Sequence, residues 1–112
     1  MNTHRPFANL ALAAAGVWFA LATLSFAGGP QAVDAVAVFG EAINNDGVID
    51  ADLQAEVGGK FVTVAEVRNA TNASWLARFD AVHTRRVRLQ VLHSGGPCPH
   101  TDVYEMEVFG RP

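Results

Sequence analysis

The segment Asn44-Asn45-Asp46-Gly47 places two amides, a carboxylate and a glycine in succession. Such oxygens bind Ca²⁺ in the EF-hand loop, which has Gly at position six, an Asp at position one and a bidentate Glu at position twelve. Counting from Gly47 puts Ala42 at position one and Leu53 at position twelve. Both of the strongest ligands are missing, so we interpret the segment as a turn whose residues tolerate left-handed backbone.

The histidines and the single cysteine do not form a catalytic motif. His83, His93 and His100 lack a short metal-binding spacing, and no serine stands in a nucleophile elbow. Cys98 lies between two prolines, without the local signature of a thiol nucleophile. A lone cysteine also excludes an internal disulfide and argues against a thiolate metal cluster. We therefore expect a protein that is not an enzyme.

Composition indicates one domain without a nucleic-acid partner. The chain has 112 residues, half of them apolar, which is enough to bury an independent core. Its formal net charge is −3, and its only basic cluster, Arg85, Arg86 and Arg88, lies inside a strand pattern. Binding to phosphates would need a basic patch.

Alternation of apolar and polar residues predicts the strands. Val33 to Phe39 is apolar on both faces apart from Asp34, which predicts a central strand. Ile49 to Val57 alternates and predicts an edge or solvent-faced strand. It should bury Ile49, Leu53 and Val57 and expose Asp50, Asp52 and Glu56. Gly58-Gly59 suits a tight turn, so Lys60 to Val67 is expected to return as the partner strand.

The second half of the chain continues this pattern. Trp75 to Phe79 predicts a short strand, followed by a corner at Asp80 to His83. Arg86 to Val91 and Tyr104 to Val108 each alternate, and we expect them to pair as an antiparallel hairpin. Arg86 and Arg88 would then face Glu105 and Glu107. About six strands without helical periodicity after Ala27 predict an all-β antiparallel sandwich.

The N-terminus resembles an export signal. Residues 1–22 form a hydrophobic leader, and a signal peptide is expected to extend to about Ala27, because Phe7 to Ala27 is uncharged and ends in Ser25-Phe26-Ala27. This predicts a secreted, extracellular or periplasmic protein whose domain occupies residues 23–112. In the alternative interpretation Leu24 and Phe26 belong to a strand of the domain. A third alternative is a single membrane-spanning anchor.

Several segments together resemble a known family. Arg85 to Val91 (RRVRLQV), a loop with Gly and Pro, and Glu105 to Gly110 (EMEVFG) are similar to the close of the coagulation factor 5/8 type C domain, the discoidin or galactose-binding-like module. Val33 to Phe39 and Gly47 to Phe61 resemble its earlier strands, so the similarity covers roughly the last three-quarters of the chain. It implies a jelly-roll β-sandwich of the bacterial type, truncated on its N-terminal side.

The resemblance also implies a site. In that family the loops corresponding to Glu41–Asp46 and Ser94–Thr101 line a sugar site. This suits the general concentration of binding residues on loops that a rigid scaffold positions. The ligand-binding candidates are Glu41, Asn44, Asn45, Asp46, His93 and His100. Trp75 is assigned to the core. Glu105 matches a family Glu that helps hold a structural calcium, the one cofactor that the resemblance suggests.

Three functions follow. The first is a non-catalytic module that binds a carbohydrate or another cell-surface polymer. The second is an accessory C-terminal module, or fragment, of a secreted glycoside hydrolase similar to α-L-fucosidases. The third is a structural or adhesion domain without a small ligand. The expected partner is a glycan or cell-surface polymer, and membrane contact is expected only through an uncleaved N-terminal segment.

Overall fold

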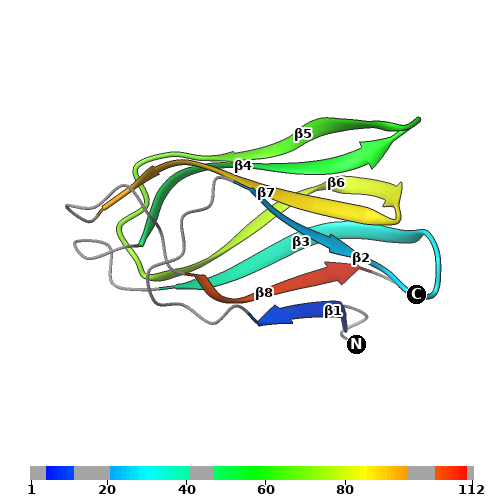
Figure 1. Ribbon diagram of the computed structural model, residues 1–112, viewed down its shortest axis with the longest axis horizontal. Helices are drawn as coiled ribbons and strands as arrows, with labels where there is room; N and C mark the ends of the chain where they lie inside the picture. Colours follow the sequence, from blue (N-terminus) through cyan, green and yellow to red (C-terminus); the bar gives the residue numbers. More distant parts are fainter. Residues whose placement is uncertain (1–4, 12–20, 41–46, 96–102, 111–112) are drawn as a thin grey trace.

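The protein is a sandwich of two antiparallel sheets (Figure 1). The computed structural model describes residues 5–11, 21–40, 47–95 and 103–110. Sheet A has the order β1 (Arg5–Ala11), β8 (Val103–Gly110), β3 (Gln31–Gly40) and β6 (Ser74–Thr84). Sheet B has the order β2 (Leu21–Ser25), β7 (Arg86–Ser94), β4 (Val48–Val57) and β5 (Lys60–Val67). The predicted all-β antiparallel sandwich is confirmed. Within the described residues no helix is long and apolar enough to cross a membrane.

The core lies between the two sheets and is built from aliphatic side chains that alternate with outward-facing residues. β3 runs between β8 and β6, as expected for a central strand. Burying these side chains stabilises the fold by about 25 cal/mol for each Å² of apolar surface removed from water. The largest fully buried apolar side chains are Leu53, Leu89, Met106, Val33, Val36, Val38, Val48, Val87, Val103 and Val108.

Strand β4 differs from its predicted position and from part of its predicted pattern. It is an interior strand between β7 and β5 rather than an edge strand. Leu53 is fully buried as predicted, but Val57 is 46% exposed beside the turn. Val48 is buried in place of Ile49, because irregularities in the pairing with β7 at Val48/Asp50 and Asp50/Ala51 shift the alternation.

The turn between β4 and β5 is the predicted hairpin. Val57 pairs with Lys60, and Gly58 and Gly59 have φ values of 60° and 82°. Both central residues of a type I′ turn need positive φ, which glycine adopts without steric cost. This sequence signal therefore fixes both the turn and the neighbouring strands.

The predicted hairpin between the last two strands is wrong. β7 lies in sheet B and β8 in sheet A, so Arg86 and Arg88 do not face Glu105 and Glu107. Arg86 instead pairs with Glu56 on β4 at 3.1 Å between Nη1 and Oε2. Alternation tells which face of a strand is buried, but it does not tell which strand lies beside it.

Strand β6 continues through the predicted corner at 80–83. It extends from Ser74 to Thr84, and its register against β3 jumps from Val33↔Val82 to Ala35↔Arg78. The residues between Arg78 and Val82 therefore form an irregularity within one strand and not a corner between two strands.

The apolar N-terminal segment contributes to the sandwich. β1 pairs with β8, and β2 pairs with β7 through Ala22↔Leu89 and Leu24↔Val87. Ala22 and Leu24 are buried in the core cluster, and Phe26 packs against it. The structure thus places Leu24 in a strand, as in the alternative interpretation of this segment.

Candidate functional site

The ends of β3, β5 and β7 and the starts of β4, β6 and β8 lie at one end of the sandwich, which we call the loop end (Figure 1). Residues 41–46 link β3 to β4, and residues 96–102 link β7 to β8. The residues that flank these two connections are neighbours at both of their ends. Gly40 pairs with Val103, and the N–H of Gly95 donates to the carbonyl oxygen of Gly47 at 3.0 Å. Two segments far apart in sequence are thus held side by side at their bases.

A third connection, residues 68–73 between β5 and β6, lies at the same end. The N–H of Ala70 donates to the carbonyl oxygen of Ile49 at 3.1 Å, and the N–H of Gly40 donates to that of Ala73 at 3.0 Å. Asn69, Thr71 and Asn72 are exposed in this connection. This connection was not among the loops predicted to line the site, although polar residues follow Val67 in the sequence.

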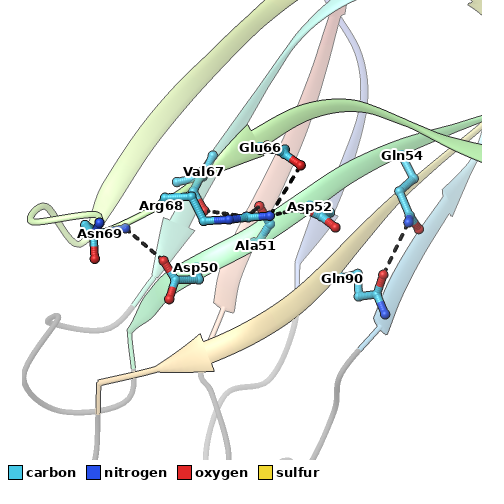
Figure 2. Close-up of polar contacts among 9 residues, drawn as sticks. All are labelled: Asp50, Ala51, Asp52, Gln54, Glu66, Val67, Arg68, Asn69 and Gln90. Carbon is cyan, nitrogen blue, oxygen red and sulfur yellow. Dashed lines mark hydrogen bonds and ion pairs between the residues drawn. The ribbon is translucent and has the colours of Figure 1, made fainter.

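Arg68 fastens this third connection to β4 (Figure 2). Its Nη1 donates to the carbonyl oxygens of Ala51 and Val67, both at 2.9 Å. Its Nη2 lies 2.7 Å from Oδ1 of Asp52 and 3.5 Å from Oε2 of Glu66. One guanidinium therefore engages two backbone carbonyls and two carboxylates, a use of several donors that a lysine cannot reproduce in the same plane.

The acidic neighbours of this guanidinium favour its charged form further. The hydrogen bond to Asp52, followed by the charges of Asp52, Glu66 and Asp50, raises the pKa of Arg68 above its ordinary value. The exposed carboxylate of Glu66 lies at the rim of the cluster, where its oxygens remain open to solvent. Arg68 therefore holds the carboxylates of Asp52 and Glu66 in place, and their oxygens are available as hydrogen-bond acceptors.

Asp50 uses its two oxygens to join two elements. Oδ1 accepts from the N–H of Asn69 at 2.8 Å, and Oδ2 lies 3.4 Å from Nδ1 of His93 on β7. Asn69 has a φ of 55°, a left-handed conformation that asparagine tolerates. Asp50, Asp52 and Glu56 were expected to be exposed, but their side chains are only 23%, 18% and 20% exposed. Contacts with other residues cover them: Asn69 and His93 for Asp50, Arg68 for Asp52 and Arg86 for Glu56.

The predicted ligand-binding residues divide into two groups. Glu41, Asn44, Asn45, Asp46 and His100 lie outside the described residues. His93 is described, and its imidazole is 63% exposed beside Asp50 at the loop end. The assignment of these residues to a ligand site stays a prediction, while the bases of the two connections that carry them are adjacent.

Glu105 lies on β8, where it pairs with Phe39 of β3. A hydrogen bond to Glu105, together with partial desolvation and the charge of Glu105, raises the pKa of Glu107. The described part of the chain contains no group of three or more His, Cys, Asp or Glu side chains arranged to hold a metal ion. A calcium site at Glu105 stays a prediction.

Two aromatic residues flank the loop end. Trp75 packs against the core cluster, in agreement with its predicted core role, and its buried Nε1 has no hydrogen-bond partner among the residues that the structure describes. Phe39, the penultimate residue of β3, is 38% exposed. Phe39 was expected in a strand that is apolar on both faces, but it follows buried Val38 and therefore lies on the outer face of sheet A, although strands flank it on both sides.

Comparisons with known proteins identify the fold. The sequence matches no family model and no curated protein. A putative α-L-fucosidase from Bacteroides thetaiotaomicron superposes with a TM-score of 0.75 at 19% identity, over 96% of this chain and 23% of that one. The fold is that of galactose-binding-like carbohydrate-binding modules.

Two carbohydrate-binding modules have the same fold. Chitosan-binding module 1 of a chitosanase/glucanase from Paenibacillus sp. IK-5 has a TM-score of 0.64 at 21% identity, over 80% of this chain and 67% of that one. The family 32 carbohydrate-binding module from Clostridium perfringens, solved in complex with galactose, has a TM-score of 0.59 at 15% identity, over 79% and 64%. This chain thus spans about a quarter of the fucosidase and about two thirds of the modules.

Proposed function

We propose that this chain is a non-catalytic module that binds a glycan at the loop end. The observation that carries the proposal is that the strand ends from which connections 41–46, 68–73 and 96–102 leave the sandwich are neighbours, joined by the Gly47–Gly95 and Gly40–Ala73 hydrogen bonds. Rigid scaffolds that display polar loops are the usual setting of binding sites. The likeness to a module solved in complex with galactose supports the same ligand class.

The described side chains suit sugar hydroxyls. Glu66 offers an exposed carboxylate, His93 an exposed imidazole, and Asn69 and Asn72 exposed amides. Such a set combines donors and acceptors, which a sugar needs because each hydroxyl both donates and accepts. Phe39 adds a partly exposed ring at the same end, where it can cover an apolar sugar face.

A second candidate function is an accessory module of a glycoside hydrolase. It is favoured by the fucosidase match, in which almost this whole chain superposes on a small part of a larger enzyme. An in-frame catalytic domain encoded beside this chain supports this function, and a free-standing reading frame with its own ligand opposes it.

We also propose that the chain is exported, on the basis of its apolar leader. Cleavage near Ala27 would remove β1 and β2, so these residues cannot be both a cleaved leader and the first two strands of the mature domain. Mass spectrometry of exported protein decides between them. A mature chain that begins near Gly28 supports cleavage, whereas retention of Leu24 assigns the segment to the domain.

A glycan array tests the proposed ligand class. We expect the folded chain to bind neutral glycans that end in galactose, N-acetylgalactosamine or fucose, and His93→Ala to weaken that binding. His83→Ala is the matched control, because His83 is also exposed but pairs with Ala32 at the opposite end of the sandwich. A blank array with folded protein contradicts the proposal and favours a structural domain without a small ligand.

A further inference from the structure

The outer face of sheet B holds an arginine that is fixed in place. The guanidinium carbon of Arg88 lies 4.0 Å from the ring centroid of Phe61 on β5. Its Nε donates to Oε1 of Gln54 on β4 at 2.7 Å. Gln54 is itself 9% exposed, and its Nε2 donates to Oε1 of Gln90 at 3.2 Å (Figure 2). Ring stacking and the Nε contact orient the plane of the guanidinium and leave its two Nη groups to donate elsewhere.

This arginine lacks an acidic partner among the described residues. The carboxylates on the same face have other partners: Glu56 pairs with Arg86, Asp52 and Glu66 pair with Arg68, and Asp50 lies 3.4 Å from the imidazole of His93. Among the residues that the structure describes, the polar partner of Arg88 is the neutral amide of Gln54. Arg88 thus forms no ion pair with the described carboxylates.

Hydroxyl groups lie beside it on the edge strand. Thr23 pairs with Arg88, and Ser25 pairs with Arg86, so these β2 residues share the outer face with the two arginines. Both are exposed, whereas the alternate residues Ala22 and Leu24 are buried. The surface thus combines a planar cation with neutral donors and acceptors.

We propose that Arg88, with Thr23 and Gln90, forms a second ligand site, which binds the carboxylate or sulfate group of an acidic polysaccharide. A guanidinium held in a plane presents two parallel N–H groups to such an anion, and charge-assisted bidentate contacts are about twice as strong as neutral ones. The neighbouring hydroxyls and amide suit sugar hydroxyls. The anion site rests on the geometry of Arg88, while the choice of a polysaccharide rests on the proposed function.

Affinity electrophoresis tests this site. The full chain is run through gels that contain polygalacturonate, dextran sulfate or neutral dextran, at low and at high salt. We expect retardation by at least one acidic polymer, none by dextran, and weakening with salt. The two acidic polymers distinguish a carboxylate from a sulfate ligand.

Substitutions locate the site. Arg88→Gln should lower the affinity for the acidic polymer about tenfold. Arg78→Gln, which removes the same charge from an exposed residue on sheet A, should leave it unchanged. Arg88→Lys keeps the charge, and circular dichroism checks its fold. It should lose most of the affinity, because an ammonium cannot replace the planar pair of donors.

Three results overturn the proposal: no salt-sensitive retardation of the folded chain by either acidic polymer, equal losses in Arg88→Gln and Arg78→Gln, or full affinity in Arg88→Lys. Arg88→Gln should leave binding to neutral glycans unchanged. Retardation that depends on Arg88 in a chain that binds no neutral glycan would uphold the anion site while the loop-end function fails.

Discussion

The backbone N–H of Gly95 donates a 3.0 Å hydrogen bond to the carbonyl oxygen of Gly47. This contact joins the bases of two connections that lie far apart in sequence. It continues the β4–β7 ladder beyond Val48↔Ser94 to the points where both strands leave sheet B. Connections 41–46 and 96–102 therefore share a backbone hydrogen bond at their bases. A ligand that touches both would meet a preorganised base, which lowers the cost of ordering it.

Replacing Leu53 by Ala should destabilise the fold by about 2 to 5 kcal/mol, because the side chain is fully buried between the sheets. The matched control is Val57→Ala on the same strand, where the side chain is 46% exposed and a much smaller loss is expected. Denaturant unfolding gives both free energies. Equal losses for the two variants would contradict the assignment of Leu53 to the core.

The hydroxyl of Thr84 should contribute to stability at the opposite end of the sandwich. Thr84 is 2% exposed, and its Oγ1 donates to the carbonyl oxygen of Glu56 at 2.7 Å and accepts from the N–H of Arg86 at 3.2 Å. Thr84→Val keeps the shape but leaves both partners unsatisfied, so about 1 to 3 kcal/mol should be lost. Thr63→Val on exposed β5 should change the unfolding free energy by less than about 0.5 kcal/mol. A loss that small in Thr84→Val would show that water replaces the hydroxyl.

Glu107 should make stability depend on pH. Its folded pKa is raised above 4.5, chiefly through Glu105, so its protonated form is favoured in the folded state. The resulting stabilisation is present below that ordinary pKa and is lost as the pH rises through the raised folded pKa. Glu107→Gln should therefore raise Tm relative to the native chain more at about pH 7 than at about pH 4. The gain should be about 0.2 to 1 kcal/mol, as for an exposed pair. A Tm difference that does not vary with pH would contradict the coupling.

The N-terminal strands should be needed for folding. A chain of residues 28–112 lacks β1 and β2 and leaves Val87 and Leu89 without the cover of Ala22 and Leu24. Circular dichroism and thermal melting should show a lower Tm or no cooperative transition for that chain, compared with residues 1–112. An unchanged melting curve would show that the segment is dispensable and would favour its role as a removable leader.

Most strands could be predicted from sequence because burial on one face enforces a period of two, and Gly58-Gly59 fixed a register locally. The partner of each strand could not be predicted, because the segments that contain Arg86 and Glu105 alternate equally well whether or not they lie side by side. The bulges of β4 escaped prediction for a related reason. Because of them Val48 is buried in the core instead of Ile49. Both side chains are apolar and β-branched, so the alternation does not tell which of the two is buried.

The site was accessible from sequence only in part. Polar runs indicated the connections that carry the Asn44–Asp46 segment and His100, but the third connection begins and ends beside their bases only because β5 and β6, which it joins, lie in different sheets. The roles of Arg68 and Asp50 depend on contacts between residues more than 15 positions apart, such as the hydrogen bond from Arg68 to Ala51, 17 positions away. Such contacts leave no local pattern.

Calorimetric titration of the full chain with galactosides and fucosides tests the central claim, that the loop end binds a glycan. The double variant Asn45→Ala/His100→Ala removes an amide and an imidazole from the two connections. The control Gln31→Ala/His83→Ala removes the same groups from residues that pair with Thr84 and Ala32 at the opposite end. We predict that the native chain and the control bind with equal affinity and that the loop-end variant loses at least about tenfold, or about 1.4 kcal/mol. Binding that survives unaltered in the loop-end variant, or that is lost in the control, would contradict the account.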